Sequence, residues 1–357
     1  MPFHLQPLPL PSSVNVETAA VLRQLAKAHR ALAELKGAAQ TIPNESILID
    51  TLSLQEAKDS SEIENIITTE DQLFQGDSYS GTYPTVAAKE VHRYALALKI
   101  GFQRVRGQQF LRLEDVLEIQ AVIEESRSGL RRMPGTVLKN SHSGEVIYEP
   151  PQDPHEIESL MSNFLAYFHS DEPDTPDPLV RMALLHYQFE SIHPFYDGNG
   201  RTGRILNLLH LVLHGLLDLP VLYLSRYIVR NKSAYYTGLQ LVRDEQAWEA
   251  WILYMLTAVE VTAIETLTMV KGIRELMQTT KHRLRSELPK IYSQDLLNNL
   301  FRHPYTKIDF IERDLSVSRP TATKYLNDLE KLRIVRKVKL GRTNYYVNEP
   351  LFSLLKT

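Results

Sequence analysis

The amino-acid sequence predicts a mainly α-helical protein with two small β regions. Apolar residues recur at helical spacing through residues 179–190 and fill almost all of residues 205–213, as in helices buried in a core. Two β-prone runs flank a polar turn within residues 135–151, which predicts a short hairpin. A second strand–turn–strand pattern follows two helical patterns near the C-terminus. The expected fold is therefore a helical core with a small hairpin, plus a separate C-terminal domain.

Composition narrows the class of protein. The 357 residues, 43% of them hydrophobic, suffice for two or three domains. The chain has no cysteine, which excludes disulfides, thiolate metal sites and a cysteine nucleophile, and favours a cytoplasmic location. We find no apolar run of the ~18–20 residues that cross a bilayer and no secretory signal, so we expect no contact with a membrane.

Three domains are expected along the chain. Residues 1–100 form an N-terminal helical region, with helices near 18–36, 54–67 and 86–98. Residues 101–285 form the core, which contains an acidic, proline-rich surface loop and ends in two helices. That loop spans residues 170–178, and the two trailing helices span 248–270 and 271–288. Residues 286–357 form the C-terminal domain.

Ser60 and Glu64 are four residues apart in the second expected helix. This spacing places both side chains on one face of a helix. Taken alone, such a pair is most simply a solvated helix face. Its meaning depends on what lies opposite.

The loop between the two core helices concentrates residues that suit a nucleoside triphosphate. Its sequence, residues 193–204, is HPFYDGNGRTGR. Two glycines allow positive φ and turn backbone N–H groups toward an anion, and two arginines can bind phosphate oxygens bidentately. The carboxylate can hold Mg²⁺ together with substrate phosphates, and the imidazole can accept a proton near neutral pH. The residues with these roles are His193, Asp197, Gly198, Gly200, Arg201 and Arg204.

This segment resembles the signature of the Fic family, H-x-F-x-[DE]-G-N-G-R-x-x-R, at every defined position, and the likeness extends over about residues 40–245. The resemblance implies a helical enzyme that transfers AMP from ATP to a protein hydroxyl and releases pyrophosphate. His193 would be the general base, and Asp197 would bind Mg²⁺. The residues that the resemblance places against ATP are Glu64, His193, Gly198, Asn199, Gly200, Arg201, Thr202, Gly203, Arg204 and Tyr235. Asn199 and neighbouring amides would hold phosphate oxygens, and Tyr235 would lie near the adenine.

Two further features gain a meaning from the same resemblance. Ser60 to Asn65 is similar to the family's inhibitory helix, [ST]-x-x-x-E-[GN]. In that case Glu64 would pair with Arg204, in the space that the γ-phosphate needs. The hairpin within residues 135–151 would be a flap that positions the target segment by strand addition. Without the resemblance, it is an ordinary surface hairpin.

The C-terminal domain differs from the rest in charge and pattern. Residues 286–357 hold 13 Lys and Arg against 8 Asp and Glu, whereas the preceding 285 residues hold 27 against 35. Short helices at 305–315 and 319–332 precede strands at 334–340 and 344–348, which resembles a winged helix-turn-helix. Arg319, Thr321, Thr323 and Lys324 would then face DNA, with Lys337, Lys339 and Arg342 on the wing. Many winged helices bind proteins instead.

Two functions therefore compete. The first is an auto-inhibited protein adenylyltransferase that uses ATP and Mg²⁺ on an unknown target protein or on itself. The second is a DNA-binding transcriptional regulator whose core only senses nucleotide. An intact His193 with both arginines favours the first, since a sensor needs no base. The acceptor residue, the removal of AMP, the preference among nucleotides and the formation of a homodimer stay open.

Overall fold

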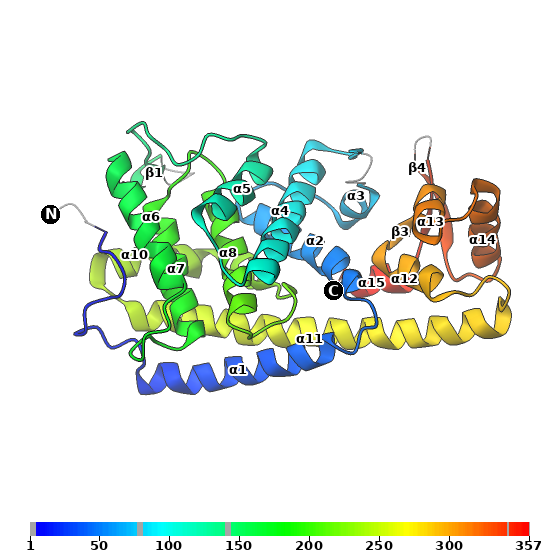
Figure 1. Ribbon diagram of the computed structural model, residues 1–357, viewed down its shortest axis with the longest axis horizontal. Coiled ribbons are helices and arrows are strands. Elements are labelled where there is room, and N and C mark those ends of the chain that lie inside the picture. The colour runs from blue at the N-terminus through cyan, green and yellow to red at the C-terminus, as the bar shows by residue number, and fades with distance from the viewer. Residues whose placement is uncertain (1–4, 77–80, 140–143, 341–342, 357) are drawn as a thin grey trace.

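The computed structural model describes residues 5–76, 81–139, 144–340 and 343–356. In this part of the chain, fifteen helices and five short strands form an elongated molecule (Figure 1). The helices before the C-terminal quarter are α1 (Ala19–Ala39), α2 (Glu45–Ile63), α3 (Glu70–Gln75), α4 (Val86–Gln108), α5 (Leu113–Glu124), α6 (Pro154–Phe168), α7 (Pro178–Ile192), α8 (Asn199–Leu213), α9 (Leu224–Arg230), α10 (Lys232–Glu245) and α11 (Trp248–Glu287). The mainly α fold class is confirmed.

Helix α11 runs nearly the whole length of the molecule, and α1 packs along it (Figure 1). The expected break between residues 270 and 271 is wrong, because the apolar positions continue in helical register past it and stay buried as far as Leu284. Among the described residues, α11 is also long and apolar enough, by length and composition, to cross a membrane. Our reading that no segment would qualify was thus too strict. Since 56% of its apolar window is buried inside the protein, this one helix is weak evidence for a span.

The C-terminal elements gather at one end of α11 (Figure 1). They are α12 (Gln294–Arg302), β3 (Tyr305–Thr306), α13 (Ile308–Leu315), α14 (Arg319–Lys331), β4 (Arg336–Leu340), β5 (Thr343–Val347) and α15 (Glu349–Leu355). The strands form one antiparallel sheet in the order β3-β5-β4. The expected helix from residue 305 starts instead at Ile308, because the two residues at 305 and 306 pair with β5. Arg342 lies outside the described residues.

Helix α2 lies between the core and the C-terminal elements, packing against α4, α9 and α12. It begins nine residues earlier than we expected, at Glu45, where the Asn44 side chain accepts a hydrogen bond from the Ser46 N–H. It also ends earlier, at Ile63, and Glu64 is its C-cap. The N-terminal helices at 18–36 and 86–98 likewise extend further, as α1 and α4.

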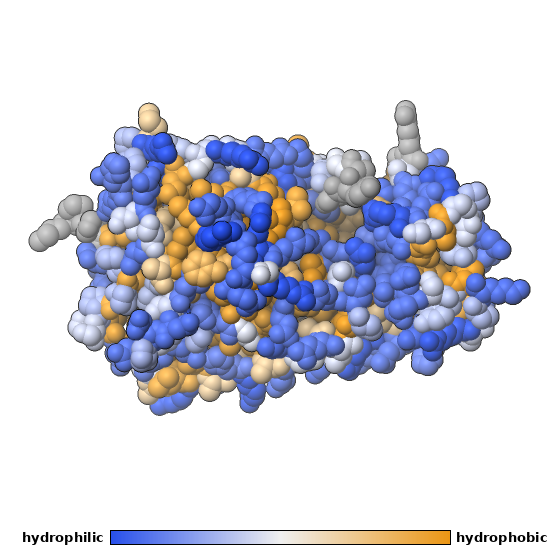
Figure 2. All heavy atoms as spheres, viewed as in Figure 1, coloured by the Kyte–Doolittle hydropathy of each residue, from blue (hydrophilic) through white to orange (hydrophobic). Residues whose placement is uncertain are grey.

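The core is one continuous apolar cluster that reaches from α1 to α15. On the face seen in Figure 2, apolar surface gathers over the region of α4 to α8, while the end with α13 and α14 is hydrophilic apart from one apolar spot over these two helices. Several large apolar side chains near the loop that follows α7 are exposed, namely Met133, Val146, Ile147 and Tyr196. These side chains leave apolar surface exposed beside that loop.

Candidate active site

The candidate site is built on the turn that joins α7 to α8. Helix α7 ends at Ile192, and His193 follows it in the left-handed conformation, with φ of 50° and ψ of 58°. A residue before proline is usually extended, but His193, which precedes Pro194, is left-handed because it forms the C-cap of α7. Gly198 also has positive φ, 76°, and α8 begins at the next residue. The first turn of α8 therefore faces this loop. The free N–H groups at a helix N-terminus attract anions, so this arrangement suits a phosphate.

The second glycine of the motif is needed because it has no side chain, and not because of its backbone conformation. Gly200 lies inside α8 and has no positive φ, contrary to our expectation. A Cβ at this position would lie 2.6 Å from Oε1 of Glu64. Only glycine thus lets that carboxylate approach the helix so closely.

Asn199 shapes the loop from within. Its Oδ1 accepts from the Phe195 N–H at 2.8 Å, and its Nδ2 donates to the Phe195 carbonyl at 2.8 Å. Both polar atoms of this buried side chain bind the Phe195 backbone, so the contacts present support the loop, and the expected contact with a phosphate stays a prediction. Asn199 closes the loop on itself and so orients the residues on either side.

His193 is partly buried under the turn. Burial, with the positive charge of Arg131 as the second cause, lowers the pKa of the imidazole to about 4. The ring is therefore neutral at neutral pH, which is the form that a general base needs. Its Nδ1 is buried and has no hydrogen-bond partner in the described part of the chain.

Arg204 is fully buried and held by the end of α2. Its Nε donates to Oγ of Ser60 at 2.7 Å, and its Nη2 donates to the Ser60 carbonyl at 3.0 Å. The same Nη2 forms an ion pair with Oε1 of Glu64 at 2.7 Å. The structure thus contains the Glu64–Arg204 contact that the resemblance implied.

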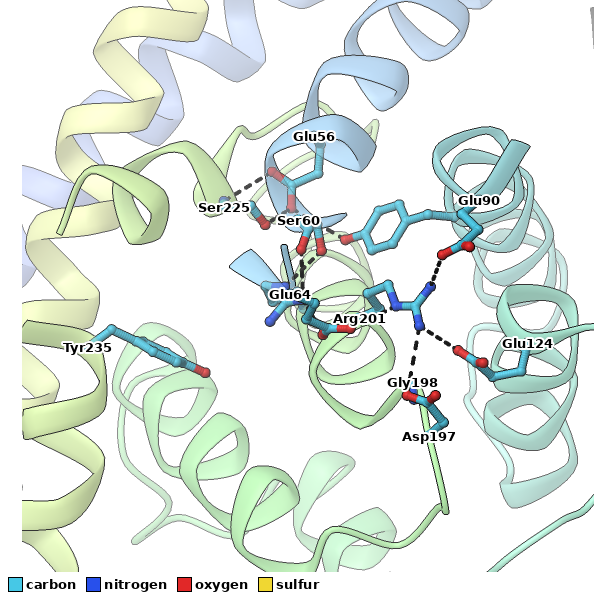
Figure 3. A network of polar contacts seen from close by, with 12 residues as sticks. Glu56, Ser60, Glu64, Glu90, Glu124, Asp197, Gly198, Arg201, Ser225 and Tyr235 are labelled. Atoms are coloured by element: carbon cyan, nitrogen blue, oxygen red, sulfur yellow. Dashed lines mark hydrogen bonds and ion pairs between the residues drawn. The ribbon is translucent and has the colours of Figure 1, made fainter. Parts of the chain in front are cut away.

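Arg201 is surrounded by carboxylates (Figure 3). Its Nε pairs with Oε2 of Glu64 at 2.9 Å, so one carboxylate binds both arginines. Nη2 lies 2.7 Å from Oε1 of Glu124, and Nη1 lies 3.7 Å from Oε2 of Glu90. Sequence reasoning missed Glu90 and Glu124, because each is an ordinary acidic residue on its own helix and only the fold brings them to Arg201.

Asp197 is the most open of the predicted residues. Its side chain is 76% exposed, and its Oδ1 accepts from the Gly198 N–H at 2.7 Å. It lies at a pocket of about 480 Å³, whose charged lining is Asp197, Arg201, Arg93, Glu64, Glu90 and Glu124. The described residues contain no group of three or more His, Asp or Glu able to hold a metal by themselves. A single open carboxylate nevertheless fits Mg²⁺ that takes its remaining ligands from phosphates and water.

Of the predicted residues, only Glu64, Asp197 and Arg201 line this pocket, and three of the others lie within the packed core. Thr202 is fully buried, and Gly203 packs against Phe189. Tyr235 is 2% exposed, and its hydroxyl contacts Nε2 of His186 at 2.9 Å inside the core. Figure 3 shows its ring apart from the network of polar contacts around Arg201. A packing role for Tyr235 agrees with these contacts better than the expected place near adenine.

A buried acidic network ties α2 to α9, and the sequence had no visible signal for it. Glu56 accepts from the Ser225 N–H at 3.1 Å, contacts the Ser225 hydroxyl closely, and lies 3.3 Å from the Tyr94 hydroxyl. Burial raises the pKa of Glu56 to about 8, so this carboxyl is mostly protonated at neutral pH. Burial also raises the pKa of Asp59 to about 6, while Arg226 opposes that shift. These contacts position the helix that carries Ser60.

The predicted hairpin is present beside the loop. Its strands are β1 (Leu138–Lys139) and β2 (Val146–Tyr148), and residues 140–143 of its turn lie outside the described residues. The Tyr148 hydroxyl donates to the Ser191 carbonyl at 2.8 Å. The hairpin is thereby fastened two residues before His193, with Val146 and Ile147 exposed.

Three family models match the chain in succession. The Fic/DOC family N-terminal model matches residues 22–103, and the Fic/DOC family model matches residues 110–211. The chain belongs to the Fic/DOC family. The third model, the C-terminal domain of SoFic-like protein adenylyltransferases, matches residues 276–351 of this Fic protein.

Solved structures share the fold, and curated proteins share part of the sequence. The fold is similar to a Fic family protein from Desulfovibrio desulfuricans G20, with a TM-score of 0.56 and 19% identity over 96% of this chain and 98% of that one. It is also similar to a Fic domain containing signaling protein from Bacteroides thetaiotaomicron, with a TM-score of 0.54 and 21% identity over 71% and 97% of the two chains. The curated "Protein adenylyltransferase Fic" of Drosophila melanogaster is 34% identical over 94 residues, which is 26% of this chain and 18% of that protein. The Fic protein thus spans only about a fifth of that relative's length.

Proposed function

We propose that this Fic protein transfers AMP from ATP to a Ser, Thr or Tyr hydroxyl of a target protein or of itself. One observation carries the proposal: the turn from His193 to Gly198 leads into α8, whose first turns carry Arg201 and Arg204, and Arg201 and Asp197 line one pocket. Attack at phosphorus needs positioned charge more than covalent help from the protein. The similarity to proteins named adenylyltransferases supports the same chemistry.

The residues divide the reaction between them. The neutral imidazole of His193 accepts the proton of the acceptor hydroxyl as that oxygen bonds to the α-phosphorus. The bond from the α-phosphorus to the bridging oxygen breaks, and pyrophosphate leaves with the electron pair. Arg201 and Arg204 hold the β- and γ-phosphates, and Asp197 would hold Mg²⁺. The metal neutralises phosphate charge when it is bound.

We further propose that Glu64 inhibits the enzyme. Its carboxylate contacts both arginines that the phosphates need, at 2.9 and 2.7 Å. Charge-assisted hydrogen bonds of this kind compete with phosphate contacts on equal terms. ATP would therefore bind productively only after Glu64, at the end of α2, has released the two arginines. This account predicts a slow wild type and a fast Glu64→Gly variant.

The test measures incorporation of labelled AMP into protein, together with the intact mass after incubation with ATP and Mg²⁺. We expect Glu64→Gly to gain the mass of one adenylyl group or more, and the added change His193→Ala to lower the rate by ~10²–10⁴-fold. The matched control is His155→Ala, an exposed histidine on α6, which should keep the full rate. No transfer by Glu64→Gly to itself or to a lysate would overturn the proposal.

A second candidate function has one observation in its favour. Lys324 on α14 and Lys337 and Lys339 on β4 are exposed, on the region that resembles a winged helix. Arg319, by contrast, already pairs with Asp309 and Glu312. We propose duplex DNA as a ligand of this surface. Binding should weaken with salt, and Lys324→Glu with Lys339→Glu should reduce both the affinity and the salt slope. Equal binding by the variant and the wild type would exclude this surface.

A further inference from the structure

The backbone at the proposed catalytic base is in an unfavourable conformation. His193 has a left-handed φ of 50°, which is unfavourable for a residue other than glycine. It also stands at the end of α7, where the last carbonyls lack partners within the helix. Such a conformation persists only where the surroundings determine it. The neighbouring elements must therefore supply contacts that hold it.

One buried arginine supplies them. Arg131 is 1% exposed, and its Nε donates to the His193 carbonyl at 2.7 Å. Its Nη2 donates to the Ile192 carbonyl at 3.3 Å and also contacts the Pro151 carbonyl. The guanidinium thus satisfies the last two carbonyls of the helix end with a positive charge, the sign that a helix C-terminus favours.

The backbone after this arginine binds the same loop. The Arg131 N–H donates to the Pro194 carbonyl at 2.9 Å. The N–H groups of Arg132 and Met133 both donate to the Tyr196 hydroxyl, at 2.9 and 3.0 Å. Three consecutive N–H groups and one side chain of the 131–133 segment therefore hold residues 192–196 from outside the family signature.

The cost of burying this arginine argues against a role in stability alone. The partners named above are neutral carbonyls, and its Nη1 has no partner within the described ranges. Burial lowers the pKa of the Arg131 guanidinium, which reflects how unfavourable the charge is there. Buried charges that lack an ionic partner usually destabilise a fold. Its place directly behind His193 offers a reason for the charge.

We propose that Arg131 is a positioning residue for the transfer reaction: through the His193 and Ile192 carbonyls it fixes the imidazole in line with the phosphate site. The 131–133 segment and Tyr196 complete the same support. The inference rests on the proposed function and deepens it. It assigns to the loop before the hairpin a part in catalysis that is separate from target docking.

The test compares variants in the Glu64→Gly background, where transfer is fastest. Arg131→Gln should lower kcat by about 10²-fold, the cost of displacing a reacting group by about 1 Å, while the KM for ATP changes less than about twofold. Arg131→Lys keeps the positive charge but not the planar guanidinium with its several N–H donors, and should recover part of the loss in kcat. The control Arg127→Gln, an exposed arginine nearby, should keep the full rate.

Two more readouts separate positioning from mere folding. Tyr196→Phe removes one hydroxyl from a half-exposed ring and should lower kcat by about tenfold with an unchanged melting temperature. The acidic limb of the rate profile should move to higher pH in Arg131→Gln. The charged groups around His193 are Arg131, Arg243 and, in the wild type, Glu64. Among these charges Arg131 lowers the pKa of the imidazole most and so helps burial to keep the ring neutral.

The outcomes distinguish the two proposals. If Glu64→Gly itself transfers no AMP, the proposed function fails, whatever Arg131 does. If Glu64→Gly is active and both Arg131→Gln and Tyr196→Phe match it, the positioning role is overturned. A raised KM for ATP with an unchanged kcat would also overturn it, because the segment would then act on nucleotide binding.

Discussion

The two ends of helix α2 are held by different forces. Its first half packs Ile47, Leu48 and Leu52 into the core with no exposed surface, and Asp50 adds ion pairs to Lys99 and Arg302. Its last turn buries Ile63 but also binds through Ser60 and Glu64 to buried arginines. No ligand can replace the apolar contacts, whereas phosphates can replace a carboxylate on an arginine. One helix can thus stay anchored at one end and be exchangeable at the other.

The largest expected effect is on stability, from a substitution in the first half of α2, which is anchored by apolar contacts. Leu52→Ala removes a fully buried side chain and should lower the free energy of unfolding by about 2–5 kcal/mol. Chemical denaturation measures the loss. The variant should remain as inhibited as the wild type where it is folded. A loss below about 1 kcal/mol would show that this end is not the anchor.

A substitution at the C-terminal end of α2, where phosphates can replace Glu64, should change the activity more than the stability. Glu64→Gly should raise AMP transfer by roughly 10–100-fold, since hydrogen bonds to charged groups contribute about 1.5–3 kcal/mol. Glu62→Gly is a matched control, because Glu62 is not among the carboxylates that contact either arginine in the described part of the chain. Equal rates for wild type and Glu64→Gly would refute inhibition by this contact.

Glu56, between the two ends, should give stability a pH dependence. Its folded pKa is raised to about 8, so its contribution is complete below the unfolded pKa and is lost as pH rises through 8. For one proton, the slope between those values reaches at most about −1.4 kcal/mol per pH unit. Glu56→Gln, which mimics the protonated form, should flatten this part of the curve in urea denaturation from pH 5.5 to 8. Parallel curves for both proteins would contradict the assignment.

The smallest effect should come from the ion pairs of the anchored end. Asp50→Asn removes contacts of 2.6 and 2.8 Å that are partly open to solvent, and should cost about 1 kcal/mol or less. Added salt should shrink the difference from wild type. Although burial opposes it, Lys99 and Arg302 lower the pKa of Asp50, so the contribution should fade as pH falls below the usual range of a carboxyl. A loss that salt does not change would assign it to packing instead.

The local sequence pattern was sufficient to predict a helix or hairpin whose formation depends mainly on its own residues. The helices on either side of the motif, the hairpin, and the helix–helix–strand–strand order near the C-terminus all follow from periodicity and turn residues. The predicted helix boundaries were wrong where contacts with residues distant in the sequence extend a helix, as in α2 and in α11. The short strand β3 was taken for helix because its partner, β5, lies forty residues later.

The sequence by itself determined the helical class and the loop at residues 193–204, whereas the pairing of Glu64 with Arg204 was implied only by the resemblance to the Fic family. The class and the loop depend on periodicity and on a dense local motif, which a linear reading can see. Tertiary structure decided the rest: that Glu64 binds both arginines, that Glu90 and Glu124 complete the cluster, that Asn199 serves the loop, and that Arg131 lies behind His193. Burial and charge act between side chains separated by tens of residues or more along the chain, and only folding sets those distances.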